Sequence, residues 1–243
     1  MTRPSRAVVV ARREVLTAFE TPVGWMVLAA LPAASAAFFF VLGPFFAIGQ
    51  ADLRGFFSNL PWLLSLVGPA LTMRSWAEER RSGADELLTT WPLTTSELVV
   101  GKFLGAAVVL ALALAATGGI VATVALLGDL DAGAVVGGYL GAFLLGTCAL
   151  AVGEFFSALT RSQVVAWIAA VAVLVALQLV GIAAGAEALP EAVRAVLLHL
   201  SLQTHYQPMT HGVVDLGGVL WLLALTGGFL AATGLVLEAR REG

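Results

Sequence analysis

The charged side chains best placed to bind a partner gather in one polar segment, residues 74–102, between two long apolar runs. The segment holds four basic and five acidic residues, and its densest charges are Glu78, Glu79, Arg80 and Arg81. Charges of both signs on a short helix set the register of a docked protein more than they add affinity. We therefore interpret this segment as a surface that meets a soluble partner.

The same segment carries signals for short helices. Gly83 stands where one helix would end, because glycine takes the left-handed conformation that closes a helix at least cost. A second short piece is expected from 85 to 91, stopped by Pro92. Thr94 and Glu97 have the spacing of a capping box, which predicts a new helix entering the next apolar run.

Residues for catalysis are sparse. The histidines His199, His205 and His211 are six apart, a spacing that a helix does not place on one face, and no cysteine or close carboxylate pair completes a metal set. The sequence has no GxSxG or HExxH motif and no GxxxxGK[ST] loop. We therefore expect no catalytic residue, no bound metal and no nucleotide hydrolysis by this chain.

Composition indicates the class of protein. Of the 243 residues, 59% are hydrophobic and 12% are charged, with a mean hydropathy of +0.93, whereas soluble domains are roughly 45–50% apolar. The sequence predicts an all-α, multi-pass membrane protein. A net charge of −3 gives no reason to expect a nucleic-acid partner. The one cysteine, Cys148, excludes an intrachain disulfide.

Six apolar runs are long enough to span a bilayer, since about 20 residues cross roughly 30 Å of hydrocarbon. They are residues 23–48, 56–73, 103–127, 134–159, 164–184 and 213–237. Residues 5–20 have the pattern of an amphipathic helix lying at the membrane interface. Residues 187–212 are too polar to span, and an outer re-entrant helical segment and a plain surface connection both stay open. We expect one domain, 1–243, to contain all of these.

The positions of the basic residues predict the orientation, because positive residues are retained on the cytoplasmic side. With six spans, the N-terminal leader, the polar segment, the turn at 160–163 and the C-terminal tail share one side, which carries eleven of the thirteen basic residues. Arg54 and Arg194 fall on the other side. We therefore expect both termini and the polar segment in the cytoplasm.

Glycines in the fourth run are spaced for close helix packing. Gly133, Gly137 and Gly141 form two successive GxxxG steps, and small residues at this spacing let helix backbones approach closely. Packing within one bundle and an interface between subunits both stay open.

Ionisable residues near mid-membrane would be expected in an ion or proton carrier, because they persist there mainly for function. This sequence has almost none. Glu154 lies near the cytoplasmic end of the fourth run, where we expect an interface residue or a partner for Arg161. Gln178 is the main strongly polar side chain deep in the fifth run.

Residues 69–105 follow a pattern that goes beyond composition. Its members are Pro69, Leu71, Thr72, Met73, Arg74, Glu78, Glu79, Arg80, Ser82, Gly83, Glu86, Leu87, Leu88, Pro92, Gly101 and Lys102. The pattern resembles the signature region of ABC-2 type transporter permeases, and is closest to the gliding-motility-associated and nitrous-oxide-reductase-maturation group. The stretch SALTRSQVVA, residues 157–166, is similar to the family's turn between the fourth and fifth spans.

The resemblance implies a permease subunit of an exporter in the inner, or cytoplasmic, membrane. It would pair with a second permease chain, identical or a paralogue, and with ABC ATP-binding subunits that hold ATP and Mg, while this chain binds no cofactor. Residues 74–101 would form the cytoplasmic coupling region that docks on the ATPase. The resemblance places the coupling role on Trp76, Glu78, Glu79, Arg80, Arg81, Ser82, Gly83 and Glu86, and a secondary cytoplasmic contact on Thr160, Arg161 and Ser162.

Two other classes of function stay open. One is an ATP-independent secondary carrier or channel, which is disfavoured because the sequence shows no internal repeat and few mid-membrane charges. The other is a membrane scaffold. The apolar lining is compatible with lipids, hydrophobic drugs, peptides or a mechanical role, so the sequence names no substrate.

Overall fold

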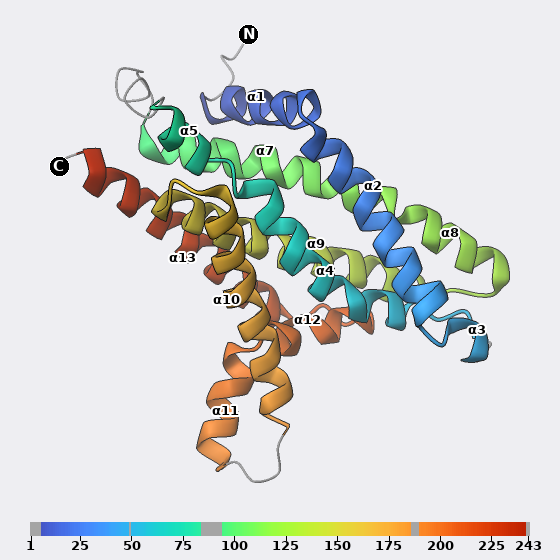
Figure 1. Cartoon of the computed structure of the whole chain (residues 1–243). Helices are drawn as coiled ribbons and strands as arrows, with labels where there is room; N and C mark the ends of the chain where they lie inside the picture. Colours follow the sequence, from blue (N-terminus) through green and yellow to red (C-terminus); the bar gives the residue numbers. More distant parts are fainter. Residues whose placement is uncertain (1–5, 49, 84–93, 186–189, 242–243) are drawn as a thin grey trace.

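The computed structural model describes residues 6–48, 50–83, 94–185 and 190–241. All regular secondary structure in these ranges is helical, as the composition predicts (Figure 1). The elements are α1 Arg6–Glu20, α2 Pro22–Ala36, the π-helical η1 Ala37–Leu42, α3 Phe45–Ile48, α4 Arg54–Thr72, α5 Ala77–Ser82, α7 Thr95–Ala116, α8 Gly118–Leu127, α9 Ala132–Leu159, α10 Gln163–Ala183, α11 Glu191–Leu200, α12 Leu202–Thr210 and α13 Leu216–Arg241.

Six helical stretches of the described residues are long and apolar enough to span a membrane, which confirms the predicted number. They are Pro22–Leu42, Arg54–Ser82, Thr95–Leu127, Ala132–Leu159, Gln163–Ala183 and Leu216–Arg240. The first ends at Leu42 and not near residue 48, because the helix is interrupted at Gly43 and Pro44. The third begins at Thr95 and not near residue 103, because its capping box starts the helix there.

Helix α9 lies at the centre of the bundle and packs against α4, α7, α10, α12 and α13. Glycines along it leave room for neighbouring side chains to approach the backbone. A Cβ at Gly146 would lie 2.6 Å from Leu110 of α7, and one at Gly153 would lie 2.8 Å from Pro69 of α4. The buried core therefore forms around a helix whose glycines admit close neighbours at several points.

The same glycine spacing brings α9 against the outer segment. A Cβ at Gly137 would lie 2.5 Å from the carbonyl oxygen of Met209, and one at Gly141 would lie 3.0 Å from Tyr206. Both contacts are with α12 of the same chain. At the start of α9, the backbone of Gly133 faces Gly212, whose φ of 78° is in the left-handed region. Within this chain, the two GxxxG steps thus serve packing inside the bundle.

Side chains of other helices donate hydrogen bonds to backbone carbonyls of α4, and a proline frees one of these carbonyls. Pro61 has no N–H, so the carbonyl of Phe57 loses its donor within the helix, and the Tyr206 hydroxyl of α12 donates to it at 2.9 Å. The Gln178 side chain of α10 donates to the Pro61 carbonyl at 2.9 Å and to the Ser65 hydroxyl at 2.6 Å. These bonds hold α10 and α12 to α4 inside the apolar bundle.

Residues 187–212 contain two helices, α11 and α12, separated at Ser201. Helix α12 packs in the bundle, whereas α11 and the end of α10 extend beyond the other helices (Figure 1). Val193, Val196 and Leu200 on α11 are exposed. Whether this segment re-enters a membrane stays a prediction.

Replacing Tyr206 with phenylalanine should lower the free energy of unfolding by about 1 kcal/mol, because the buried Phe57 carbonyl would lose its donor. Burial raises the pKa of the Tyr206 hydroxyl, so this bond should persist through neutral and mildly alkaline pH. Thermal unfolding of the purified protein in detergent checks the loss. The control is Ser58→Ala, because the exposed Ser58 hydroxyl bonds only to the Arg54 carbonyl of its own helix in the described structure. Equal stability of the Tyr206 variant and the wild type would contradict a stabilising role for the hydrogen bond between Tyr206 and Phe57.

Candidate functional site

The short helix α5 is attached to the bundle at its first residues. The Ser157 hydroxyl of α9 accepts from the backbone N–H groups of Trp76 and Ala77, both at 3.1 Å, and donates to the Met73 carbonyl at 2.9 Å. The first N–H groups of a helix have no partner within it and need one from elsewhere. Ser157 thus acts as a cap supplied by another helix, and ties the start of α5 to α9.

The Lys102 side chain of α7 makes the second attachment. It is only 4% exposed, and its ammonium donates to the Ser75 carbonyl and to Oε1 of Glu79, both at 2.6 Å. Glu14 of α1 lies 3.5 Å from the same nitrogen, and the Trp76 ring centroid lies 4.5 Å away. A buried charge is tolerated only with such partners. Lys102 therefore joins α1, α5 and α7 at one point.

The C-terminal end of α9 makes the third attachment. Arg80 of α5 donates to the Ala158 carbonyl at 3.1 Å, and Arg240 of α13 donates to the same carbonyl at 2.6 Å and to that of Leu159 at 3.3 Å. The last carbonyls of a helix lack internal donors and carry partial negative charge, which suits guanidinium groups. Helices α5 and α13 thus meet at the end of α9.

Glu78 forms a fourth contact, with the start of α10. Its Oε2 accepts from the Gln163 side-chain amide, and Arg74 lies 3.9 Å from the same oxygen. Glu78 and Arg74 are both partly exposed. Each of α7, α9 and α10 therefore contacts the chain between α4 and the end of α5.

Helix α1 lies against α7 along two glycines. A Cβ at Gly101 would lie 2.6 Å from Val10, and one at Gly105 would lie 2.5 Å from the Cβ of Glu14. This close approach is what brings Glu14 within reach of Lys102. The predicted helix at residues 5–20 is present as α1, and its location at a membrane surface stays a prediction.

The predicted coupling residues divide into two groups. Trp76, Glu79 and Arg80 point into the protein, where they make the contacts described above. The residues exposed on α5 and its cap are Arg81, Ser82 and Gly83. Glu86 lies outside the described residues.

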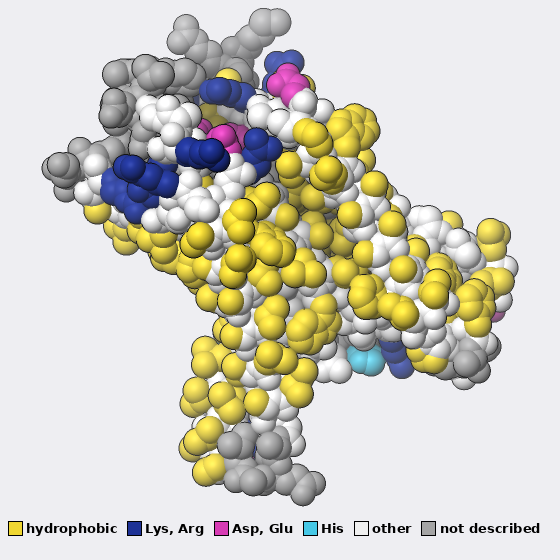
Figure 2. Space-filling view, viewed as in Figure 1, with side chains coloured by type: hydrophobic (Ala, Val, Ile, Leu, Met, Phe, Trp, Pro, Cys, Tyr) yellow, Lys and Arg dark blue, Asp and Glu magenta, His cyan; other side chains and the backbone are white. Residues whose placement is uncertain are grey.

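Two of the three local structure signals in this region are confirmed, and the third, the short piece expected from 85 to 91, lies outside the described residues. Gly83 ends α5 with a φ of 71°, and the Thr94 hydroxyl and the Glu97 carboxylate exchange bonds with each other's backbone N–H at 3.2 and 2.9 Å. Lys and Arg side chains gather at the end of the molecule where α1, α5 and the C-terminal end of α13 lie (Figure 2). Acidic side chains lie among them, so this end carries charges of both signs (Figure 2).

The turn between α9 and α10 lies beside α5. Thr160 is partly buried, whereas Arg161 and Ser162 are exposed. The Thr160 hydroxyl accepts from the Ser162 N–H at 3.1 Å, and the Ser162 hydroxyl accepts from the Val165 N–H at the start of α10. The turn and α5 are joined through Gln163, so the predicted secondary contact is next to the predicted coupling region.

Glu154 does not pair with Arg161, one of the two roles that the sequence led us to expect, and its place at a membrane interface stays a prediction. Its side chain is completely buried in α9, and neither carboxylate oxygen has a hydrogen-bond partner. Arg161 is exposed on the turn beyond the helix end. The pattern of apolar runs could not show which helix faces this carboxylate.

Sequence reasoning did not assign a role to four residues that hold α5 or its neighbours: Ser157, Gln163, Arg240 and Glu14. Ser157 and Gln163 stand within the stretch 157–166 that carries the family resemblance, and this was the available signal for them. Arg240 and Glu14 are far from α5 in sequence, and no local pattern connects them to it.

The described residues contain no group of three or more His, Cys, Asp or Glu side chains that could hold a metal ion. His205 instead stacks on Trp221 with ring centroids 4.3 Å apart, and its Nε2 lies 3.0 Å from the His199 carbonyl. Cys148 is buried and free. These contacts are those of packing residues.

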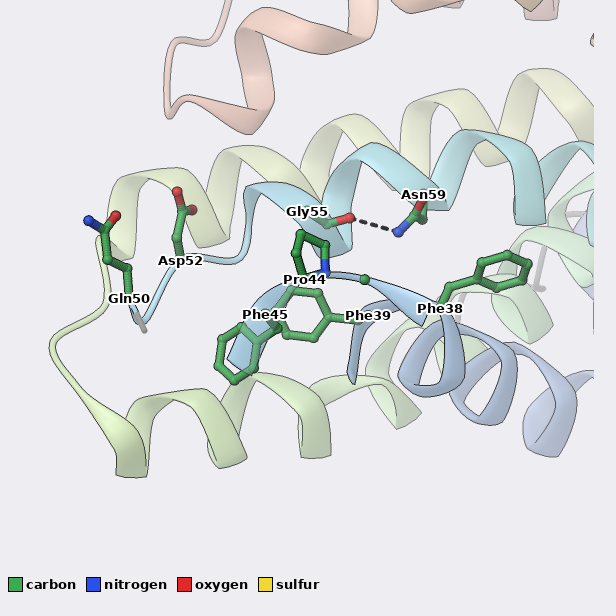
Figure 3. A pocket seen from close by; sticks show the side chains of 9 residues that line it. Phe38, Phe39, Pro44, Phe45, Gln50, Asp52, Gly55 and Asn59 are labelled. Carbon is green, nitrogen blue, oxygen red and sulfur yellow. Dashed lines mark hydrogen bonds between the residues drawn. The ribbon is translucent and has the colours of Figure 1, made fainter. Parts of the chain in front are cut away.

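A small cavity of about 130 Å³ lies at the other end of the molecule, between the first two spans (Figure 3). Its lining is Phe38, Phe39, Gly43, Pro44, Phe45, Gln50, Asp52, Gly55 and Asn59. Asn59 donates to the Gly55 carbonyl at 2.9 Å, and Asp52 lies 3.8 Å from Arg54. The lining is mainly aromatic, and its one carboxylate is already paired, so it has no acid–base machinery.

Replacing Ser157 with alanine should release α5, because two N–H groups and one carbonyl lose their partner, at a cost of about 1 to 3 kcal/mol. We expect faster hydrogen exchange at the Trp76 and Ala77 amides and easier proteolysis after residue 74. Ser82→Ala is the matched control, since Ser82 is exposed and bonds only within α5. Unchanged exchange at Trp76 and Ala77 in the Ser157 variant would show that the cap is dispensable.

The family model described as ABC-2 family transporter protein matches residues 14–237 of the chain. The match includes α5, the first five membrane-spanning stretches and the sixth up to residue 237. It does not separate the gliding-motility-associated and nitrous-oxide-reductase-maturation group from other members, and no curated protein gives a significant match. The chain belongs to the ABC-2 family of transporter proteins.

Proposed function

We propose that the chain is the permease subunit of an ABC exporter, in which a separate ATPase drives movement through α5. Family membership and the six apolar helices support the permease role. The observation that carries the coupling role is the attachment of α5. The residues on its inner face bond to α7 and α9, and Glu78 bonds to Gln163 of α10. Arg81, Ser82 and Gly83 are exposed.

The inner contacts give α5 the means to transmit a displacement. Ser157 and the Ala158 carbonyl lie at the end of α9, and α9 packs against five other helices. A partner that moves α5 would therefore pull on the central helix of the bundle. Packed elements with two discrete arrangements can carry such coupling over a long distance.

The exposed side chains around α5 indicate the chemistry of the partner. Arg81 on α5 and Arg161 on the neighbouring turn are both exposed, and so is Arg240 of α13. A basic surface favours encounter with an acidic one and fixes its register. We infer that the ATPase presents an acidic cleft to α5, with the turn at Thr160, Arg161 and Ser162 as a second contact.

The proposed topology places both termini and α5 in the cytoplasm of a cell with this chain in its inner membrane. Helix α1 would lie along the bilayer surface, with the exposed Arg12 and Arg13 side chains at the level of the lipid headgroups. ATP and Mg would be bound by the ATPase. Exposed apolar residues on α10 and α13 leave surface for lipid and for a second permease chain, identical or paralogous.

Replacing Arg81 with glutamate should weaken binding of the ATPase without unfolding the permease, because the side chain is exposed and the change opposes an acidic partner. Two like charges brought into contact cost several kcal/mol, so we expect at least about a tenfold loss of recovered ATPase. The measurement is co-purification in mild detergent from the native cells, with ATPase activity assayed in the eluate.

The control is Arg54→Glu, which makes the same charge change at the other end of the bundle and should leave recovery intact. Equal loss with both variants would mean that overall charge, and not α5, controls binding. Recovery of the permease alone from wild-type cells, under conditions that preserve other membrane complexes, would favour an ATP-independent carrier or a scaffold.

A further inference from the structure

Glu154 is a buried carboxyl that the docking of α5 does not use. It is completely buried in α9, and neither of its oxygens has a hydrogen-bond partner. Polar groups in a protein interior are almost always hydrogen-bonded, so each exception needs a physical explanation. Ser157, one turn along α9 from Glu154, bonds to Met73 and Trp76, and Lys102 bonds to the Ser75 carbonyl between them. Glu154 is therefore next to the junction that holds α5.

The partners that already surround Lys102 disfavour a third carboxylate beside it, and this favours the protonated form of Glu154. The ammonium already has two carboxylates beside it, Glu79 at 2.6 Å and Glu14 at 3.5 Å, in addition to the Ser75 carbonyl at 2.6 Å. An ionised Glu154 would add a third carboxylate to one cation, with no donor to solvate it. Burying an unpaired charge costs far more than burying a neutral carboxyl.

Other helices around α9 offer few charges that could balance Glu154. Within the described residues, α4 has only Arg54, at its other end, and α10 has no charged side chain. Helix α12 has only His205, and in α13 the charged residues Glu238, Arg240 and Arg241 lie at the C-terminal end. Arg240 is engaged with the carbonyls of Ala158 and Leu159. Lys102 is therefore the cation best placed to serve Glu154.

We propose that Glu154 is a proton-binding site linked to α5, because Lys102 serves either Glu79 on α5 or Glu154 in the bundle. The proposal rests on the proposed function in that it takes α5 to be the element that moves. When α5 leaves, Glu79 and the Ser75 carbonyl leave Lys102 with it. Glu154 then gives its proton to water on the α5 side and pairs, as a carboxylate, with the ammonium. When α5 docks again, Glu154 takes up one proton.

The direction of the pH dependence follows from this exchange. The docked state binds one more proton than the undocked state, so lower pH favours docking and higher pH favours release. Substituting Glu154 with glutamine fixes the neutral form and should remove the dependence. In the Glu154→Gln variant, Lys102 has no carboxylate to replace Glu79 except Glu14, and a neutral amide oxygen is a weaker partner for an ammonium than a carboxylate, so α5 should stay docked.

The first test reads the proton directly. Infrared spectroscopy of the purified chain in lipid nanodiscs at neutral pH should show a protonated-carboxyl band that is lost in Glu154→Gln and kept in Glu238→Gln, a control at an exposed carboxylate. A wild-type spectrum without that band would show that Glu154 is ionised and would overturn the proposal. Glu154→Leu is a second variant, and it should fold as well as the wild type if the native carboxyl is neutral.

The second test reads the docking of α5 as pH changes. A spin label at Ser82→Cys reports its mobility, and the native Cys148 does not compete because it is buried. The wild-type label should become mobile in a one-proton transition as pH rises, and the Glu154→Gln label should stay immobile throughout. The same pH curve in both proteins, or a flat curve in both, would overturn the linkage. This test uses the purified chain without an ATPase. Its result therefore does not depend on whether the co-purification experiment recovers one.

Discussion

The arrangement of the end of the molecule that holds α5 depends on the burial of one ammonium group. Lys102 enters the protein near the start of α7 and has almost no contact with water, so the neighbouring helices must supply its partners. Glu14 comes from α1, and Glu79 and the Ser75 carbonyl come from the chain that leads into α5. Three segments that are distant in sequence are therefore held at one place. A change in any one of them alters the electrostatic balance of the other two.

The centre of the bundle works by a different principle, in which the absence of side chains permits contact. Glycines along α9 let α4, α7 and α12 approach its backbone. The Tyr206 hydroxyl then bonds to the Phe57 carbonyl, which Pro61 leaves without a donor in α4, and Gln178 of α10 bonds to the Pro61 carbonyl. Such contacts fix how the helices are registered, which apolar packing alone specifies weakly.

Local signals in the sequence were sufficient for the helices but not for their contacts. The left-handed Gly83 and the capping box of Thr94 and Glu97 depend on neighbouring residues, and both could be predicted. The six spans follow from apolar length alone. The roles of Ser157 and Glu154 depend on which helix faces them, and hydrophobic runs with a weak amphipathic pattern carry little information on rotation about the helix axis. A pairing of Glu154 with Arg161 was therefore open, whereas its carboxyl is buried without a hydrogen-bond partner.

The residues that attach α5 to the bundle differ from those that it exposes for a partner, although the two sets are neighbours in sequence. Glu79 and Arg80 bond inward, while Arg81 and Ser82 are exposed. A charge reversal at Glu79 or Arg80 would thus disturb the attachment of the helix before it touched any partner, and loss of binding there would not identify a docking surface. Under the proposed coupling role, exposed positions would report the partner and buried positions would report transmission. This separation would let one short helix be held firmly enough to transmit a displacement while its exposed residues remain open to another protein.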